Sequence, residues 1–130
     1  RNTIFLSFAL SLAESIEAFD IFMGGNRMDR DNYPDCTAEY LESFEAMANQ
    51  ATGASRDPNR RFRFHAPLSR LDKGQTIQLG LQLGVNYGST SSCYDPSPEG
   101  TACGHCLACH LRIEGFKAVG VRDPIPYQNL

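Results

Sequence analysis

Apolar residues recur at helical spacing near the start of the chain. The recurring positions lie one, three or four residues apart: Ile4, Phe5, Phe8, Leu12, Ile16 and Phe19. This periodicity predicts an α-helix over residues 3–18. Because leucines and alanines occupy its other sides, we expect this helix to be largely buried.

Two later segments have the patterns of short strands. Residues 20–25 form an apolar run that ends at two glycines, which is typical of a buried parallel strand. Residues 61–66 alternate, with Phe62 and Phe64 on one face and arginines with His65 on the other, which predicts a strand with one wetter face. A histidine at a strand end is a candidate for catalysis, but a lone histidine more often packs or forms a hydrogen bond.

Three more segments have helical patterns with recognisable ends. Residues 38–52 follow Thr37, a good N-cap, and a further helix begins after Asp72 and is closed by Gly84. Residues 106–120 form the last predicted helix. The order of helices and strands predicts an α/β layered domain.

The number of strands is small for such a fold. Two strands are too few for an independent doubly wound sheet, and the first residue is Arg rather than Met. We therefore expect the chain to be the C-terminal part of a longer protein.

The composition is that of an ordinary soluble domain. The chain has 130 residues, 42% hydrophobic and 21% charged, enough for one domain with a core. A net charge of −3 gives no broad electrostatic reason to bind nucleic acid or an anionic membrane. No apolar run reaches membrane-spanning length, and clustered free thiols suit the reducing cytoplasm.

Four of the five cysteines lie in one stretch with the spacing C-x₉-C-x₂-C-x₂-C: Cys93, Cys103, Cys106 and Cys109. Two residues between cysteines allow a tight turn to direct both sulfurs to one point, and the prolines and glycine of the longer arm form a loop that returns Cys93. Four thiolates would satisfy a tetrahedral zinc ion with no open position, which is the structural kind of site.

Other interpretations of the cysteines stay open. An iron–sulfur cluster uses a similar spacing, and two disulfides are possible, although neighbours two residues apart pair poorly and nothing indicates secretion. His105 and His110 could replace a cysteine as ligands, but four cysteines suffice without them.

Two polar features suggest a ligand site. The loop over residues 26–36 is dense in polar groups and follows the first predicted strand, where α/β sheets carry their ligands. Lys73 lies in the first turn of a predicted helix, where a cation beside free N–H groups can bind an anion. A solvated loop and a solvent-pointing lysine are the plainer alternatives.

Several segments, taken in order, resemble the C-terminal part of the 7-cyano-7-deazaguanine synthase family, queuosine-biosynthesis enzymes of the PP-loop ATPase superfamily. The likeness spans nearly the whole chain, and its specific parts are Tyr-Pro-Asp-Cys and the four-cysteine segment. The matching segments are residues 1–7, 24–26, Asp29, 33–36 (Tyr-Pro-Asp-Cys), 65–68 (His-Ala-Pro-Leu), Lys73, 92–95 (Ser-Cys-Tyr-Asp), 102–109, Leu111 and Arg112.

The resemblance implies a fold. It is a Rossmann-like, layered α/β fold of the PP-loop (adenine nucleotide alpha hydrolase-like) type, with its N-terminal strands missing here and a C-terminal zinc knuckle and helix. Residues 1–90 would be the C-terminal part of the PP-loop domain, and residues 91–130 the zinc knuckle and last helix, packed on the same domain.

The resemblance also implies a reaction. The family is an ATP-dependent ligase that converts 7-carboxy-7-deazaguanine and ammonia to the nitrile through an adenylated carboxylate, with Mg²⁺ accompanying ATP. The protein positions the reactants and neutralises phosphate charge. A cytoplasmic homodimer without nucleic-acid or membrane partners is expected.

Site residues follow from the same resemblance. One structural zinc would be held by Cys93, Cys103, Cys106 and Cys109. Five residues match family positions near the substrate: Arg1, Asn2, Tyr33, Asp35 and Lys73. Arg1 and Lys73 would meet anionic groups, Tyr33 would pack on the ring, and Asp35 would accept a hydrogen bond from the deazaguanine edge. No residue is assigned to catalysis itself.

The chain departs from the family pattern in two places. The glycine-rich Ser-Gly-Gly-x-Asp-Ser loop that holds the pyrophosphate of ATP is absent, so residues 1–130 alone are expected to be inactive. Ser91 stands where the family commonly has Trp.

Two alternative functions stay open for the chain. They are a non-catalytic zinc-ribbon-like interaction module and a PP-loop tRNA-modifying enzyme with an iron–sulfur cluster.

Overall fold

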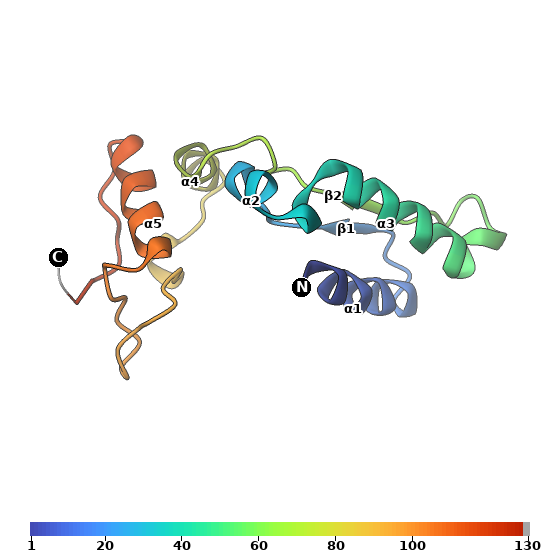
Figure 1. The fold of residues 1–130 in the computed structure, drawn as a ribbon, viewed down its shortest axis with the longest axis horizontal. Coiled ribbons are helices and arrows are strands. Elements are labelled where there is room, and N and C mark those ends of the chain that lie inside the picture. Colours follow the sequence, from blue (N-terminus) through green and yellow to red (C-terminus); the bar gives the residue numbers. More distant parts are fainter. Residues whose placement is uncertain (129–130) are drawn as a thin grey trace. The chain divides into compact units, whose positions relative to one another are not determined.

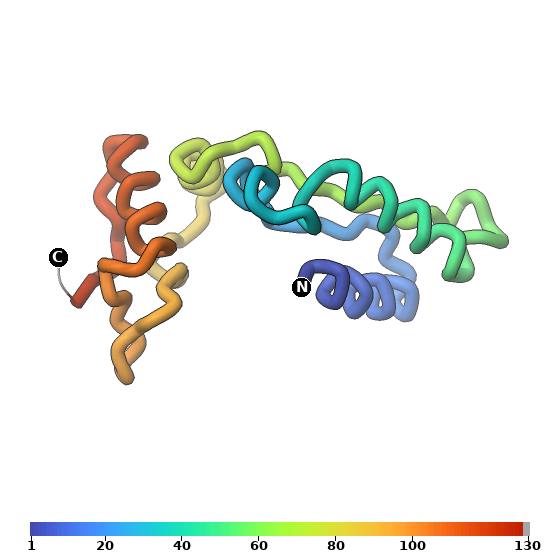
Figure 2. The backbone as a smooth tube through the Cα atoms, viewed as in Figure 1, coloured from blue at the N-terminus to red at the C-terminus, as the bar shows by residue number. Residues whose placement is uncertain are grey.

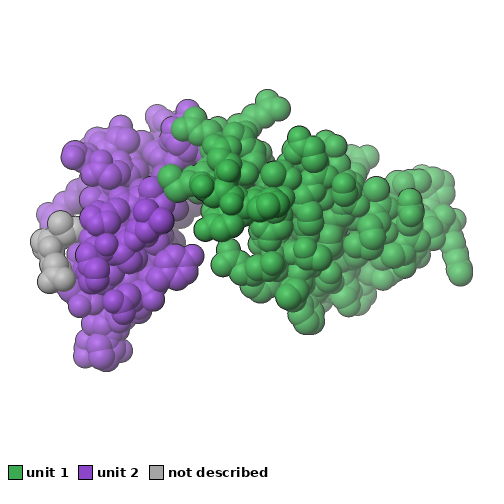
Figure 3. Space-filling view, viewed as in Figure 1, with its two compact units in different colours: residues 1–70 green, residues 71–130 purple. Residues whose placement is uncertain are grey.

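The computed structural model describes residues 1–128, which divide into two compact units. The first unit is residues 1–70 and the second is residues 71–130, of which 129 and 130 lie outside the described part (Figure 3). The division after residue 90 that the sequence suggests stays a prediction. Each unit is described by itself.

The first unit is a small parallel sheet with helices. Its helices and strands, in order, are α1 (Asn2–Ser15), β1 (Asp20–Phe22), α2 (Arg27–Asn32), η1 (Pro34–Cys36), α3 (Ala38–Ala51), η2 (Gly53–Arg56) and β2 (Arg63–His65) (Figure 1). In residues 1–128 the two strands form one sheet, paired in parallel with Ile21 opposite Phe64. This arrangement confirms the predicted α/β class.

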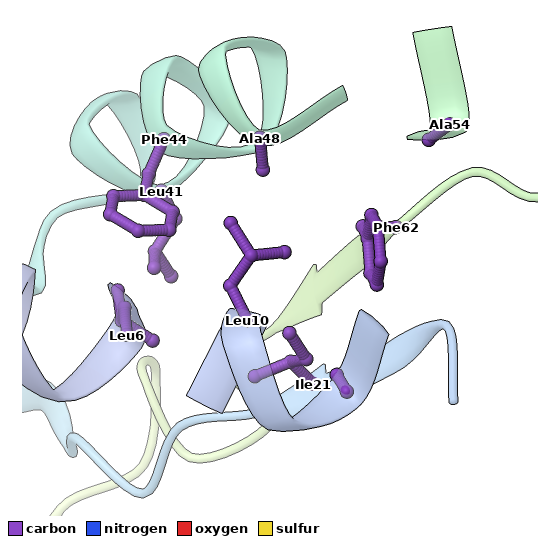
Figure 4. Close-up of a cluster of buried hydrophobic side chains, with 9 residues drawn as sticks. Leu6, Leu10, Ile21, Leu41, Phe44, Ala48, Ala54 and Phe62 are labelled. Atoms are coloured by element: carbon purple, nitrogen blue, oxygen red, sulfur yellow. The ribbon is translucent and has the colours of Figure 1, made fainter. Parts of the chain in front are cut away.

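The core of the first unit lies where α1 and α3 meet the strands (Figure 4). Its buried residues are Leu6, Leu10, Ala13, Ile21, Leu41, Phe44, Ala48, Ala54 and Phe62. Two polar side chains of α3 complete the backbone pairing near β2. Asn49 accepts a hydrogen bond from the Phe62 N–H at 2.9 Å and donates one to the Phe62 carbonyl at 2.9 Å. Glu45 accepts from the Phe64 N–H at 2.8 Å, so α3 is fixed to β2 by hydrogen bonds as well as by packing.

The prediction that α1 is largely buried is wrong. Leu6, Leu10 and Ala13 face the core, whereas the five aliphatic and aromatic residues of the predicted stripe, from Ile4 to Ile16, are each at least 60% exposed. A helix of this kind has two apolar faces, and residues 1–70 supply a surface for one of them only.

Helix starts follow the local signals closely. Thr37 caps α3 by accepting from the Tyr40 N–H, as predicted. Helix α2 was expected to be a loop, but Asn26 and Asp29 form a reciprocal capping box that starts it. The polar loop after β1 is therefore a short helix followed by η1.

The second unit is a helix pair with a long irregular arm. It contains α4 (Lys73–Gln82), η3 (Tyr87–Ser89) and α5 (Leu107–Ala118), whose backbones can be followed in Figure 2. Asp72 and Gln75 form the predicted capping box of α4. Helices α4 and α5 pack closely because Gly115 faces Ile77, where an added Cβ would lie 2.8 Å from the Ile77 Cδ1.

Among the described residues, no helix has both the length and the apolar character needed to cross a membrane.

Candidate metal centre and predicted substrate residues

The four clustered cysteines converge on one point in the second unit. The Sγ atoms of Cys93, Cys103, Cys106 and Cys109 all lie within 4.8 Å of one another, and those of Cys103 and Cys109 are 3.9 Å apart. Sulfurs placed tetrahedrally about 2.3 Å from one ion lie roughly 3.8 Å from each other. The four thiols therefore fit a single metal ion and can hold one.

Backbone turns direct these sulfurs inward. The Cys106 N–H donates to the Cys103 Sγ at 3.3 Å, and the Cys109 N–H donates to the Cys106 Sγ at 3.4 Å as α5 begins. Gly104 between them has φ +80°, a left-handed conformation that glycine adopts without strain. The C-x₂-C-x₂-C spacing thus produces two successive turns, each of which bonds an N–H to a sulfur.

Cys93, at the start of the long loop that leads to Cys103, is placed by the same kind of hydrogen bond. Its Sγ accepts from the Asp95 N–H at 3.3 Å and from the Cys103 N–H at 3.2 Å. Hydrogen bonds of this kind stabilise the thiolate form of the sulfur, which is the form that binds metals. The bond from the Cys103 N–H lowers the pKa of Cys93.

The remaining sulfurs differ in their environment. A hydrogen bond from the Tyr94 backbone, together with that from Cys109, lowers the pKa of Cys106 to about 6. Burial raises the pKa of Cys109 to about 12. A positive ion among the four sulfurs would offset the burial of charge at Cys109.

The alternatives for this segment can be compared with the geometry. All five cysteines of the chain are free thiols, so the disulfide interpretation finds no support. His105 and His110 lie outside the four-cysteine group. His105 Nδ1 lies 3.1 Å from the Cys103 carbonyl oxygen, and most of its ring is exposed.

Three of the five predicted substrate residues lie together in the first unit. The Asp35 Oδ2 accepts from the Asn2 N–H at 2.9 Å and lies 3.3 Å from the Arg1 amino nitrogen. The Asn2 side chain donates to the Asp35 carbonyl at 3.2 Å and to the Cys36 Sγ at 3.1 Å. The hydrogen bond from the Asn2 N–H lowers the pKa of Asp35. Asp35 thus acts on the N-terminus of α1 as a capping carboxylate from a distant part of the chain.

The other two predicted residues are Tyr33 and Lys73. Tyr33 lies between α2 and η1 and is 53% exposed. Lys73 is the first residue of α4 and belongs to the second unit. The structure brings together Arg1, Asn2 and Asp35, and the role of all five residues in substrate binding stays a prediction.

A cavity of about 570 Å³ lies in the first unit beside β2 and the start of α3. Cys36 and Phe64 line it, with two arginines and three glutamates at its walls. None of the five predicted substrate residues lines it, so the cavity is not assigned to them.

Two further features lie outside the predicted metal and substrate residues. Cys36 is a buried thiol, 7% exposed, that accepts a hydrogen bond from Asn2; its place in the Tyr-Pro-Asp-Cys segment was the available signal. His65 packs its ring on Phe22 and places Nε2 2.7 Å from the Asp20 Oδ1. His65 is therefore paired with Asp20 and Phe22 on the exposed face of the sheet.

Comparisons with known proteins match the chain over most of its length. A family model described as "Queuosine biosynthesis protein QueC" matches residues 1–120. The 7-cyano-7-deazaguanine synthase of Geobacter sulfurreducens is 60% identical over 127 residues, which is 98% of this chain and 54% of that protein. The enzyme of the same name from Frankia casuarinae is 56% identical over 124 residues, 95% of this chain and 52% of that protein. The chain spans about half the length of the curated relatives it matches.

Proposed function

This chain belongs to the family of queuosine biosynthesis protein QueC, and from that premise we propose that it is part of an ATP-dependent 7-cyano-7-deazaguanine synthase with one structural zinc ion. The observation that carries the proposal is sequence identity above 50% to synthases of that name along nearly the whole chain. The converging cysteines support the zinc ion.

The proposed reaction joins ammonia to the carboxylate carbon of 7-carboxy-7-deazaguanine. ATP activates the carboxylate as an acyl-adenylate, ammonia displaces AMP to give the amide, and a second activation removes the amide oxygen to leave the nitrile. A carboxylate is a poor electrophile, so the adenylate supplies the leaving group. ATP is used with Mg²⁺.

The residues of this chain would contribute binding rather than phosphate transfer. We propose that the Arg1 side chain and Lys73 meet anionic groups, that Tyr33 packs on the ring, and that Asn2 and Asp35 bind its polar edge. Asp35 Oδ2 is already used by the start of α1, and Oδ1 has only a long contact with the Cys36 thiol at 3.9 Å, so Oδ1 is the oxygen that would meet the substrate. Residues 1–130 contain no glycine-rich pyrophosphate loop, and we propose that this stretch alone is inactive.

The proposed zinc ion would hold the second unit together. Four thiolates leave no open position on the ion, so it would take no part in the reaction. The sulfur separations favour one ion over an iron–sulfur cluster, because the irons and sulfides of a cluster need more space between the four cysteines. A cytoplasmic homodimer completes the proposal and comes from the family resemblance alone.

Metal analysis tests the site. The purified chain should contain about one zinc per molecule and be colourless, because zinc has no visible absorption. Iron with a broad visible band would contradict the zinc proposal and favour the cluster-bearing tRNA enzyme.

An activity assay tests the function. The chain should be joined to the remaining N-terminal half of the Geobacter sulfurreducens relative and incubated with ATP, ammonium and 7-carboxy-7-deazaguanine. The joined protein should form the nitrile and AMP, whereas residues 1–130 alone should form neither. A correctly folded joined protein that consumes no ATP in the presence of this acid would contradict the proposed reaction.

A further inference from the structure

Residues 123–128 lie against the buried side of the cysteine site. Ile125 and Tyr127 pack on the cluster formed by Ala102, Cys103 and Cys109, whose members are 1–3% exposed. Exposure alternates along this segment, with the odd-numbered residues facing inward and the even-numbered ones outward. The inward-facing residues of the segment therefore cover the two most buried cysteines.

Backbone and side-chain hydrogen bonds attach this segment to the arm that carries the cysteines. Ala102 and Tyr127 form a parallel bridge, and the Gln128 N–H donates to the Ala102 carbonyl at 2.9 Å. The Gln128 side chain donates to the Thr101 carbonyl at 2.9 Å. These contacts end one residue before the ligand Cys103.

The other end of the segment is held by a buried ion pair. Arg112, on α5, donates through Nε and Nη2 to the two oxygens of Asp123 at 2.7 and 2.9 Å. The side chains of Arg112 and Asp123 are only 4% and 8% exposed. The Tyr127 hydroxyl donates to the Asp123 Oδ2 at 2.6 Å, which joins the two ends of the segment.

Arg112 has no N–H left unused. Its Nη1 donates to the Thr90 carbonyl at 3.1 Å and the Thr90 hydroxyl at 2.8 Å, and its Nη2 also donates to the Tyr87 carbonyl at 3.0 Å. The guanidinium therefore links α5, which contains Cys109, with residues 87–90 before the first of the four cysteines and with Asp123 after the last. Such a fully paired fork fixes geometry more strongly than a single contact.

From these contacts we propose that residues 123–128 close the metal site, and that Arg112, Asp123 and Tyr127 are positioning residues that control the rate at which the site releases its ion. The proposal rests on the proposed function of the four cysteines as metal ligands. Cys103 and Cys109 become accessible to a chelator when the segment opens, because Ile125 and Tyr127 cover them in the closed state.

The test is the transfer of zinc from the loaded chain to an excess of a chromogenic chelator. Tyr127→Phe removes one hydroxyl and its bond to a charged carboxylate, and it should release zinc about tenfold faster. Ile125→Ala uncovers the same sulfurs by a different route and should also accelerate release. Hydrogen exchange at the Gln128 amide should rise in both variants, because its bond to Ala102 breaks when the segment opens.

The matched control is Tyr94→Phe. Tyr94 is next to the ligand Cys93 but is 83% exposed, so the loss of its hydroxyl should leave release unchanged. Wild-type release rates in both Tyr127→Phe and Ile125→Ala, with helical circular dichroism retained, would overturn the inference. If the wild-type chain binds no metal, the proposed site and this inference are overturned together. If it binds metal but the two variants release it at the same rate as wild type, the inference alone is overturned.

Discussion

At the scale of single residues, charged side chains that look alike in the sequence have different tasks. Asp35 lies at the N-terminus of α1, partly open to solvent, and Asp123 is buried against Arg112. Both carboxyls have a lowered pKa. Oδ1 of the first has only a long contact with the Cys36 thiol at 3.9 Å, whereas both oxygens of the second are occupied within the protein.

Asp123→Asn should be strongly destabilising at neutral pH. It leaves the Arg112 charge buried without a counter-ion, which costs about 3 kcal/mol. Burial raises the pKa of Asp123, but the bonds from Arg112 and Tyr127 outweigh it, so the folded pKa lies below the ordinary 3.8. The stabilisation is thus present above pH 3.8 and is lost as the pH falls through the lower folded value.

The measurement is chemical denaturation of wild type and variant at several pH values. The difference between them should shrink under strongly acidic conditions, where the wild-type carboxyl is protonated. A constant difference at all pH values would show that charge is not the cause.

Asp35→Ala separates capping from substrate binding. Loss of the bond to the Asn2 N–H should lower the thermal stability of the first unit modestly. In the joined enzyme, a role in binding the substrate edge should raise KM for the acid with little change in KM for ATP. Asp35→Asn retains a capping oxygen and serves as the control, and unchanged KM in both variants would remove the substrate role.

At the scale of helices and strands, local sequence signals predicted helix caps, but they did not predict which faces of a helix would be buried. The caps at Thr37 and Asp72 were predicted because a side chain and an N–H three residues later decide them. Helix α2 was missed because residues 27–32 are polar except for Met28 and have no apolar stripe. The apolar stripe of α1 showed a helix but not which of its faces would be covered, since that depends on segments far away in the chain.

Gly115→Ala should destabilise the contact between α4 and α5. The new Cβ would lie 2.8 Å from the Ile77 Cδ1 and 3.0 Å from the Lys73 Cγ. Ile77 is 2% exposed, so its side chain must shift within a packed core, and overpacking should cost about 1–3 kcal/mol. Thermal unfolding checks this, with Gly24→Ala as control because an added Cβ there meets nothing within 4 Å. Equal melting temperatures for wild type and Gly115→Ala would contradict this, because they would show that the contact accommodates the added methyl group.

At the scale of the whole molecule, the sequence predicted the α/β class and the group of four cysteines. The structure added the contacts that hold the cysteine site in place. The cysteine spacing is local, so the convergence of the sulfurs could be inferred from it. The pairing of Arg112 with Asp123, and the covering of the site by Ile125 and Tyr127, could not. No periodicity or motif marks a contact between a helix and an extended segment after it.

Removal of the proposed zinc ion should affect one unit and spare the other. The second unit has few buried apolar side chains, and two of its buried residues are the proposed ligands Cys103 and Cys109. The core of the first unit contains none of the four ligands. Chelation should therefore increase proteolysis and hydrogen exchange within residues 91–128 and leave residues 1–70 protected. Equal loss of protection in both units would contradict this.

The parallel pairing of β1 with β2 also has a kinetic consequence. It joins residues about 43 positions apart in the chain, such as Asp20 and Arg63, and α2, η1, α3 and η2 all lie between them in sequence. Pairings of such high contact order form slowly, because the loop entropy is lost before the contact is gained. The turns that bring Cys103, Cys106 and Cys109 together close within a few residues. During refolding from denaturant, the thiols of Cys103, Cys106 and Cys109 should therefore come together before Phe62 is buried beside the sheet.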